Sequence, residues 1–121
     1  MFTSLNRMIS LAMIAWAFAA TSPAVAHARL VSATPASGAT VSAPRGISLT
    51  FSERFAAPFS TVTVEDSRGR SVDLTRTVSE DGRTLGGTYT APLPAGTYRV
   101  TWAIAAADGH RMTGTYNFTV R

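Results

Sequence analysis

The sequence has no cysteine, no lysine and only two histidines, and its one long apolar run lies at its start. Without cysteine no disulfide can hold the fold, so the packing of apolar side chains must do so. All eleven basic residues are arginines, and in the chain they stand apart from one another. This pattern predicts a solvated surface and excludes a continuous basic stripe of the kind that binds nucleic acid.

The first 26 residues have the layout of a secretory signal peptide. One positive side chain, Arg7, precedes the apolar run 8–20, and Ala24 and Ala26 supply the small residues of a cleavage motif. The run is shorter than the roughly 18 to 20 residues that a membrane-spanning helix needs. We therefore predict a cleaved signal peptide over 1–26 and one exported domain over 27–121 that does not itself span the membrane.

A second cleavage position stays open. Ala26 and Ala28 flank His27 with the same small-residue spacing, so the signal peptidase has two possible sites. Cleavage after Ala26 leaves His27 as the first residue, whereas cleavage after Ala28 removes it.

Apolar and polar residues alternate with a period of two at many places after the signal peptide, and no window has a helical period. The alternating runs are 47–51, 61–65, 98–104 and 116–120, and we count 28–32 and the weaker stretches 71–74 and 84–89 as further strands. Turn-forming residues separate them, and Asp81-Gly82 is a strong hairpin signal. About seven short strands in a domain of this length predict an all-β, immunoglobulin-like Greek-key sandwich or barrel.

His27 is a candidate metal ligand if it is the first residue. A free N-terminal histidine offers its α-amine and a ring nitrogen, which together close a chelate ring on a metal. Their ordinary pKa values, about 7.7–8.0 and about 6.5, make both donors accessible near neutral pH. Amine and imidazole donors favour Cu(II), which also leads the divalent affinity order. The alternative is a histidine that stands beside the cleavage site by chance.

Asp108 and His110 form a second candidate. They flank Gly109 in a segment expected to be a loop between the last two long strands, so a carboxylate and an imidazole can be directed at one point. The alternative is an ordinary Asp-Gly turn followed by a surface histidine.

Glu53 is a third candidate. It continues the alternation of Ile47, Leu49 and Phe51, which predicts a carboxylate at the mouth of the sandwich or buried within it. The alternative is a rim charge paired with Arg54 or another arginine.

Six segments together resemble one known family. They are His27–Leu30 (HARL), Thr34–Ala36 (TPA), Leu49–Glu53 (LTFSE), Gly96–Trp102 (GTYRVTW), and Asp108–His110 (DGH) with Gly114–Val120 (GTYNFTV). The sequence is similar from end to end to CopC, a family of periplasmic copper-resistance proteins.

The resemblance to CopC implies one Cu(II) ion per chain, held by the amine and imidazole of His27, by Asp108 and by His110. It implies that Glu53 is a weak axial ligand or donates or accepts a hydrogen bond at a ligand. It further implies a monomeric, non-enzymatic copper carrier or buffer in the periplasm, active in copper homeostasis or resistance, with an inner-membrane CopD-type transporter as a possible partner.

Two other side chains are expected to belong to the core. Some CopC members carry a methionine-rich loop for Cu(I), but Met112 is the only methionine after the signal peptide here. Met112 shares the alternation of Tyr116 and Phe118, so we predict a core residue and no Cu(I) site. Trp102 lies in mid-strand and is expected to be core as well.

Two other functions stay open at this stage. An N-terminal histidine with a second histidine is also found in copper mono-oxygenases, although Asp108 would occupy a position that oxygen chemistry needs open. A metal-free adhesive β-sandwich is the other alternative, and it predicts weak copper binding that does not depend on His110.

Overall fold

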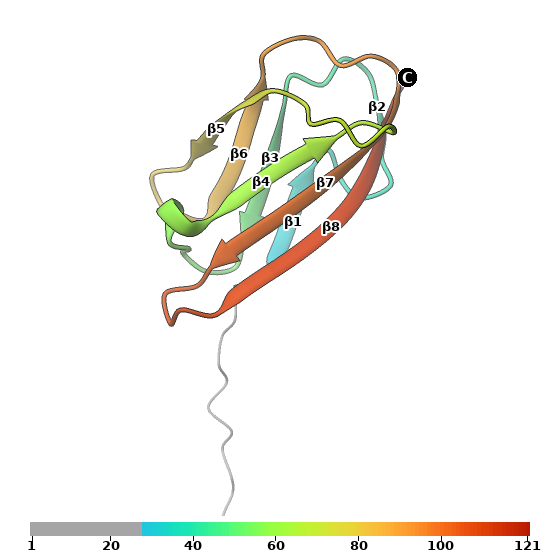
Figure 1. Ribbon diagram of the computed structural model, residues 1–121. Helices are drawn as coiled ribbons and strands as arrows, with labels where there is room; N and C mark the ends of the chain where they lie inside the picture. The colour runs from blue at the N-terminus through green and yellow to red at the C-terminus, as the bar shows by residue number, and fades with distance from the viewer. Residues whose placement is uncertain (1–27) are drawn as a thin grey trace, which may run out of the picture.

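Eight strands in two four-stranded sheets make up most of residues 28–121, the part of the chain that the computed structural model describes (Figure 1). The predicted signal peptide and His27 lie outside the described residues. The strands are β1 (Leu30–Thr34), β2 (Thr40–Val41), β3 (Gly46–Phe51), β4 (Thr61–Glu65), β5 (Leu74–Val78), β6 (Thr84–Tyr89), β7 (Gly96–Ala105) and β8 (Arg111–Val120). A short 3-10 turn, η1 (Ala57–Phe59), precedes β4.

The strand order confirms the predicted immunoglobulin-like sandwich. One sheet has the order β1-β3-β6-β5 and the other the order β2-β8-β7-β4. Without β2, the seven remaining strands have the two-sheet arrangement of a constant-type immunoglobulin domain. The two-residue β2 adds a parallel pair at the edge of β8, where Thr40 lies opposite Thr119.

The core lies between the two sheets and follows the predicted alternation. Along β7 the residues Tyr98, Val100, Trp102 and Ile104 are buried, while the residues between them are exposed or half-buried. Met112 packs partly buried against this core. The expectation that Trp102 and Met112 are core residues is therefore confirmed.

Several strand predictions differ from the structure. The run 28–32 is shifted by two residues from β1, and β8 begins at Arg111, five residues before the predicted run 116–120. The run 71–74 was expected to be a strand, but β5 begins at Leu74 and continues to Val78. Three successive residues of β5 are exposed because it is an edge strand with little to bury, so no alternation marks it. The sequence gives no signal for β2 either, because a strand of two residues is too short to show an alternation of apolar and polar side chains.

The described part of the chain has no helix with the length and apolar character needed to cross a membrane.

Candidate metal centre

The loop between β7 and β8 is a tight turn. The amide of Ala106 donates to the carbonyl of His110 at 2.8 Å, and the amide of Gly109 donates to the carbonyl of Ala106 at 2.9 Å. Gly109 has φ +87°, a left-handed conformation that residues with a Cβ avoid. This glycine lets the chain reverse between Asp108 and His110.

The turn brings the side chains of Asp108 and His110 together. The backbone amide of His110 donates to Asp108 Oδ1 at 3.0 Å, and His110 Nδ1 lies 2.9 Å from Asp108 Oδ2. Both side chains are well exposed, 64% for His110 and 41% for Asp108. A neutral imidazole that donates through Nδ1 carries its acceptor lone pair on Nε2. The predicted convergence of a carboxylate and an imidazole is therefore present in the loop.

The start of the described chain is fixed beside the end of β3. Ala28 is fully buried. The amide of Arg29 donates to Ser52 Oγ at 3.0 Å, and the amide of Ser52 donates to the carbonyl of Arg29 at 2.9 Å. The described chain therefore begins beside the end of β3.

The segment after Ser52 connects this start to the β7–β8 loop. Phe55 forms an isolated antiparallel bridge with Ala106, and the amide of Ala56 donates to the carbonyl of Ala105 at 2.8 Å. The start of the described chain, the segment that follows β3 and the β7–β8 loop thus lie at one end of the sandwich (Figure 1).

Glu53 is exposed at this end, so burial of its carboxylate, one of the two expectations, is wrong. The physical reason is that β3 ends at Phe51, and the alternation that was extended to Glu53 stops with the strand. The described residues include no ion pair between Glu53 and Arg54 or any other arginine. Its position at the mouth agrees with the other expectation.

The described residues contribute a pair of candidate metal ligands rather than a complete set. Within 28–121, no group of three or more histidine, cysteine, aspartate or glutamate side chains could hold a metal ion. Asp108 and His110 converge, Glu53 is not part of their group, and His27 lies outside the described residues. The four-residue ligand set stays a prediction.

An aromatic cluster lies beneath the same end of the sandwich. The ring centroid of Phe51 is 5.0 Å from that of Trp102 and 5.7 Å from that of Phe55, both edge to face. A Cβ added at Gly114 would lie 2.4 Å from Trp102 Cζ2, so β8 passes directly over the indole ring. Sequence reasoning missed Gly114, although a glycine inside a strand is a signal of such close approach.

The comparisons with known proteins point to one family. The family model described as CopC domain matches residues 30–121. The chain belongs to the CopC family. Copper resistance protein C of Escherichia coli is 37% identical over 106 residues, which cover 81% of this chain and 84% of that protein. Copper resistance protein C of Pseudomonas syringae pv. tomato is 33% identical and covers 97% of this chain and 98% of its own.

Solved structures agree with this membership in CopC. The crystal structure of PcoC, described as a methionine-rich copper resistance protein from Escherichia coli, matches with a TM-score of 0.72 at 35% identity. That match covers 79% of this chain and all of PcoC. CopC from Methylosinus trichosporium OB3b matches with the same TM-score at 30% identity, covering 78% of this chain and 93% of that one.

Proposed function

We propose that this protein is an exported copper carrier or buffer that holds one Cu(II) ion at the end of the sandwich where the β7–β8 loop lies. As a member of CopC, a family of copper-resistance proteins, the chain is a copper-binding protein and not an enzyme. The periplasmic location, the oxidation state and the stoichiometry are part of the proposal.

The observation that carries the proposal is the Asp108–His110 pair. Its 2.9 Å contact joins a carboxylate oxygen and a ring nitrogen, a donor chemistry suited to Cu(II). An amine and a second imidazole from His27 would complete a set of nitrogen and oxygen donors. The contact between Arg29 and Ser52 fixes the start of the described chain beside the end of β3, which supports this part of the proposal.

The roles of the other residues follow from this arrangement. Glu53, exposed at the same end, would act as a weak axial ligand or as a hydrogen-bond partner of a ligand. Met112 is half-buried and packs against the core, and it is the only methionine after the predicted signal peptide, so Cu(I) binding is not part of the proposal. An inner-membrane transporter of the CopD type would exchange copper with the exposed loop.

A Cu(II) titration of the mature protein tests the function. We expect one equivalent of Cu(II) to bind. The substitution His110→Ala should weaken binding more than about 100-fold, because the imidazole is both a proposed ligand and the contact partner of Asp108. Met112→Leu is the matched control two residues away and should bind as the natural protein does. Weak copper binding that is the same in the His110→Ala and natural proteins would favour the metal-free adhesive alternative.

Fluorescence gives a second readout of the same titration. Trp102 is the only tryptophan of the predicted mature chain, and it lies under the proposed site. Bound Cu(II) should therefore quench the emission until one equivalent is added. Binding should also weaken below about pH 5, because imidazole and amine donors take up protons before they can hold the metal.

A further inference from the structure

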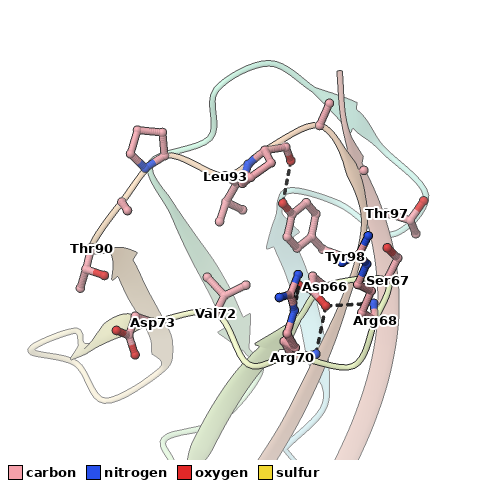
Figure 2. A pocket seen from close by; sticks show the side chains of 15 residues that line it. Asp66, Ser67, Arg68, Arg70, Val72, Asp73, Thr90, Leu93, Thr97 and Tyr98 are labelled. Carbon is pink, nitrogen blue, oxygen red and sulfur yellow. Dashed lines mark hydrogen bonds and ion pairs between the residues drawn. The ribbon is translucent and has the colours of Figure 1, made fainter.

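A pocket lies at the other end of the sandwich, away from the β7–β8 loop. Its volume is about 540 Å³, and the β4–β5 and β6–β7 loops form its walls (Figure 2). This volume is in the usual range of small-ligand sites, about 300 to 1,000 Å³. None of the residues assigned to copper lines it.

The β4–β5 wall is held in shape by Asp66. Its Oδ1 accepts hydrogen bonds from the amides of Arg68 at 2.9 Å and Arg70 at 3.0 Å, and its Oδ2 accepts one from Arg70 Nε at 3.2 Å. These contacts, led by the backbone hydrogen bond from Arg70, lower the pKa of Asp66, so this carboxylate is charged at neutral pH. Gly69 has φ +77° and lets the loop reverse between the two arginines.

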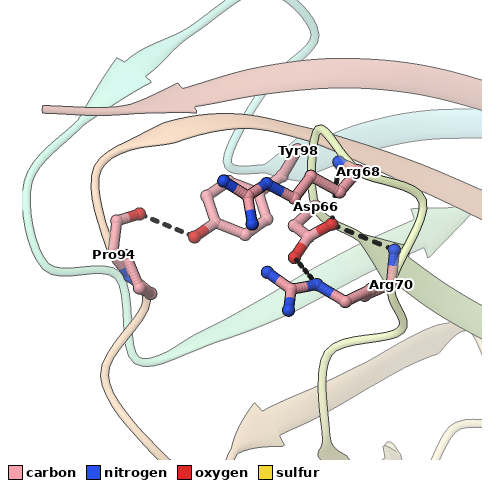
Figure 3. Close-up of polar contacts among 5 residues, drawn as sticks. All are labelled: Asp66, Arg68, Arg70, Pro94 and Tyr98. Atoms are coloured by element: carbon pink, nitrogen blue, oxygen red, sulfur yellow. Dashed lines mark hydrogen bonds and ion pairs between the residues drawn. The ribbon is translucent and has the colours of Figure 1, made fainter.

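The β6–β7 wall is held by Tyr98. Its hydroxyl donates to the carbonyl of Pro94 at 2.6 Å (Figure 3), and its ring stacks on Phe118 with centroids 5.5 Å apart. A tyrosine at the start of this strand that bonds back to the preceding corner is a recurring device of immunoglobulin-like sandwiches. Both walls are therefore organised without a ligand, which lowers the entropy lost on binding.

The charges of the pocket are separated across an apolar middle. Figure 2 shows Arg68 and Arg70 on one side and Asp73 on the other, with Val72 and Leu93 between them. The terminal nitrogens of Arg70 and the guanidinium of Arg68 make no hydrogen bond to another residue in 28–121, and the Asp73 side chain makes no ion pair there. Donors for a carboxylate thus face one side, and an acceptor for a cation faces the other.

We propose that this pocket binds a short zwitterionic peptide, with its carboxylate at Arg68 and Arg70, its ammonium group at Asp73, and an apolar side chain against Leu93. Guanidinium groups suit the planar geometry of a carboxylate. A purely anionic ligand would meet Asp66 and Asp73, and a purely cationic ligand would meet the two arginines. Only a molecule with both charges matches both sides.

The test uses the tripeptide Ala-Leu-Ala as a probe of the metal-free protein, with amide chemical shifts followed by NMR. We expect saturable shifts in the loops 66–73 and 90–97. Acetylation of the amine or amidation of the carboxylate of the peptide should each weaken binding about fivefold, the size expected of one exposed ion pair. If both blocked peptides bind as well as the free one, the zwitterion proposal is wrong.

Protein variants then assign each charge. Arg68→Gln should weaken binding of the free peptide about fivefold and reduce the effect of amidation, because only Arg70 then faces the carboxylate. Asp73→Asn should weaken binding by a similar factor and abolish the effect of acetylation. Arg111→Gln, an exposed arginine at the opposite end, is the matched control and should change nothing. Absence of saturable shifts in the natural protein, or equal binding by the Arg68→Gln and control variants, would overturn the proposal.

Discussion

The two ends of the sandwich use the same local turn and present different chemistry. At one end Asp108 accepts a hydrogen bond from the amide of His110, two residues on, and at the other Asp66 accepts one from the amide of Arg68. Each aspartate thus fixes its own loop in the same way. The residue two positions later decides the chemistry. It is an imidazole at the end with the proposed copper site, here called the copper end, and a guanidinium at the end with the pocket, here called the pocket end.

The length of β7 separates the two ends. Its ten residues run from Gly96, beside the pocket, to Ala105, beside the copper loop. At about 3.3 Å per residue this is roughly 30 Å. Substitutions at one end should therefore leave binding at the other unchanged.

The largest difference between the ends should appear in stability. Gly114→Ala places a Cβ 2.4 Å from the buried indole of Trp102, which cannot move without disturbing Phe51. We expect a loss of about 3 kcal/mol in the free energy of unfolding, as for overpacking of a core. Gly69→Ala, at the pocket end, meets no atom within 4 Å and should cost about 1 kcal/mol from its left-handed φ alone. Urea denaturation measures the free energy of unfolding of both variants. Equal losses would contradict the close contact between Gly114 and the indole of Trp102.

Substitution of the two carboxylates at the copper end should lower the Cu(II) affinity by different amounts. Asp108→Asn removes the carboxylate that contacts His110 Nδ1, and we expect a loss of up to about 100-fold. Glu53→Gln should lose at most about tenfold, because an exposed weak axial ligand or hydrogen-bond partner contributes less. Competition titrations with a Cu(II) chelator give both values. The reverse order would make Glu53 the principal carboxylate.

The smallest effect concerns Tyr89 at the end of β6. Burial, more than the neighbouring Tyr98, raises the pKa of Tyr89 to about 12, and within the described residues its buried hydroxyl has no hydrogen-bond partner. Tyr89→Phe should therefore leave the free energy of unfolding at pH 7 unchanged or raise it by about 1 kcal/mol. By contrast, Tyr116→Phe loses a 3.0 Å hydrogen bond to the carbonyl of Pro35 and should be destabilised by about 1 kcal/mol.

The same tyrosines determine the response to alkali. Burial raises the pKa of both Tyr89 and Tyr116 to about 12, above the value of about 10 in the unfolded chain. The stabilisation is complete below pH 10 and is lost as the pH rises through about 12. Denaturation at pH 9 and pH 11 should show this loss, and it should be smaller in Tyr89→Phe. An equal loss in that variant would exclude Tyr89 as a cause.

Much of the fold was predictable because burial imposes a period. The central strands β3 and β7 bury every second residue, so Leu49 and Val100 mark them plainly. The edge strand β5 carries Thr75, Arg76 and Thr77 with no such demand, and its position was misjudged.

The candidate site was predictable only where it is local. Asp108 and His110 are two residues apart, and one turn brings them together. The approach of Arg29 to Ser52 depends on the pairing of β1 with β3, which joins residues far apart in the chain and leaves no local signal. The organised pocket was missed for the same reason, since its walls come from two separate loops.

The central claim is that the copper site needs the amine and imidazole of His27 together with Asp108 and His110. The most direct test compares Cu(II) titrations of the protein starting at His27, confirmed by its mass, with one that carries a single extra glycine before His27. The extension moves the amine out of its chelate while every side chain stays in place, so we predict a loss of affinity of more than about 100-fold. If the extended protein binds Cu(II) as tightly, the site does not depend on the terminal amine.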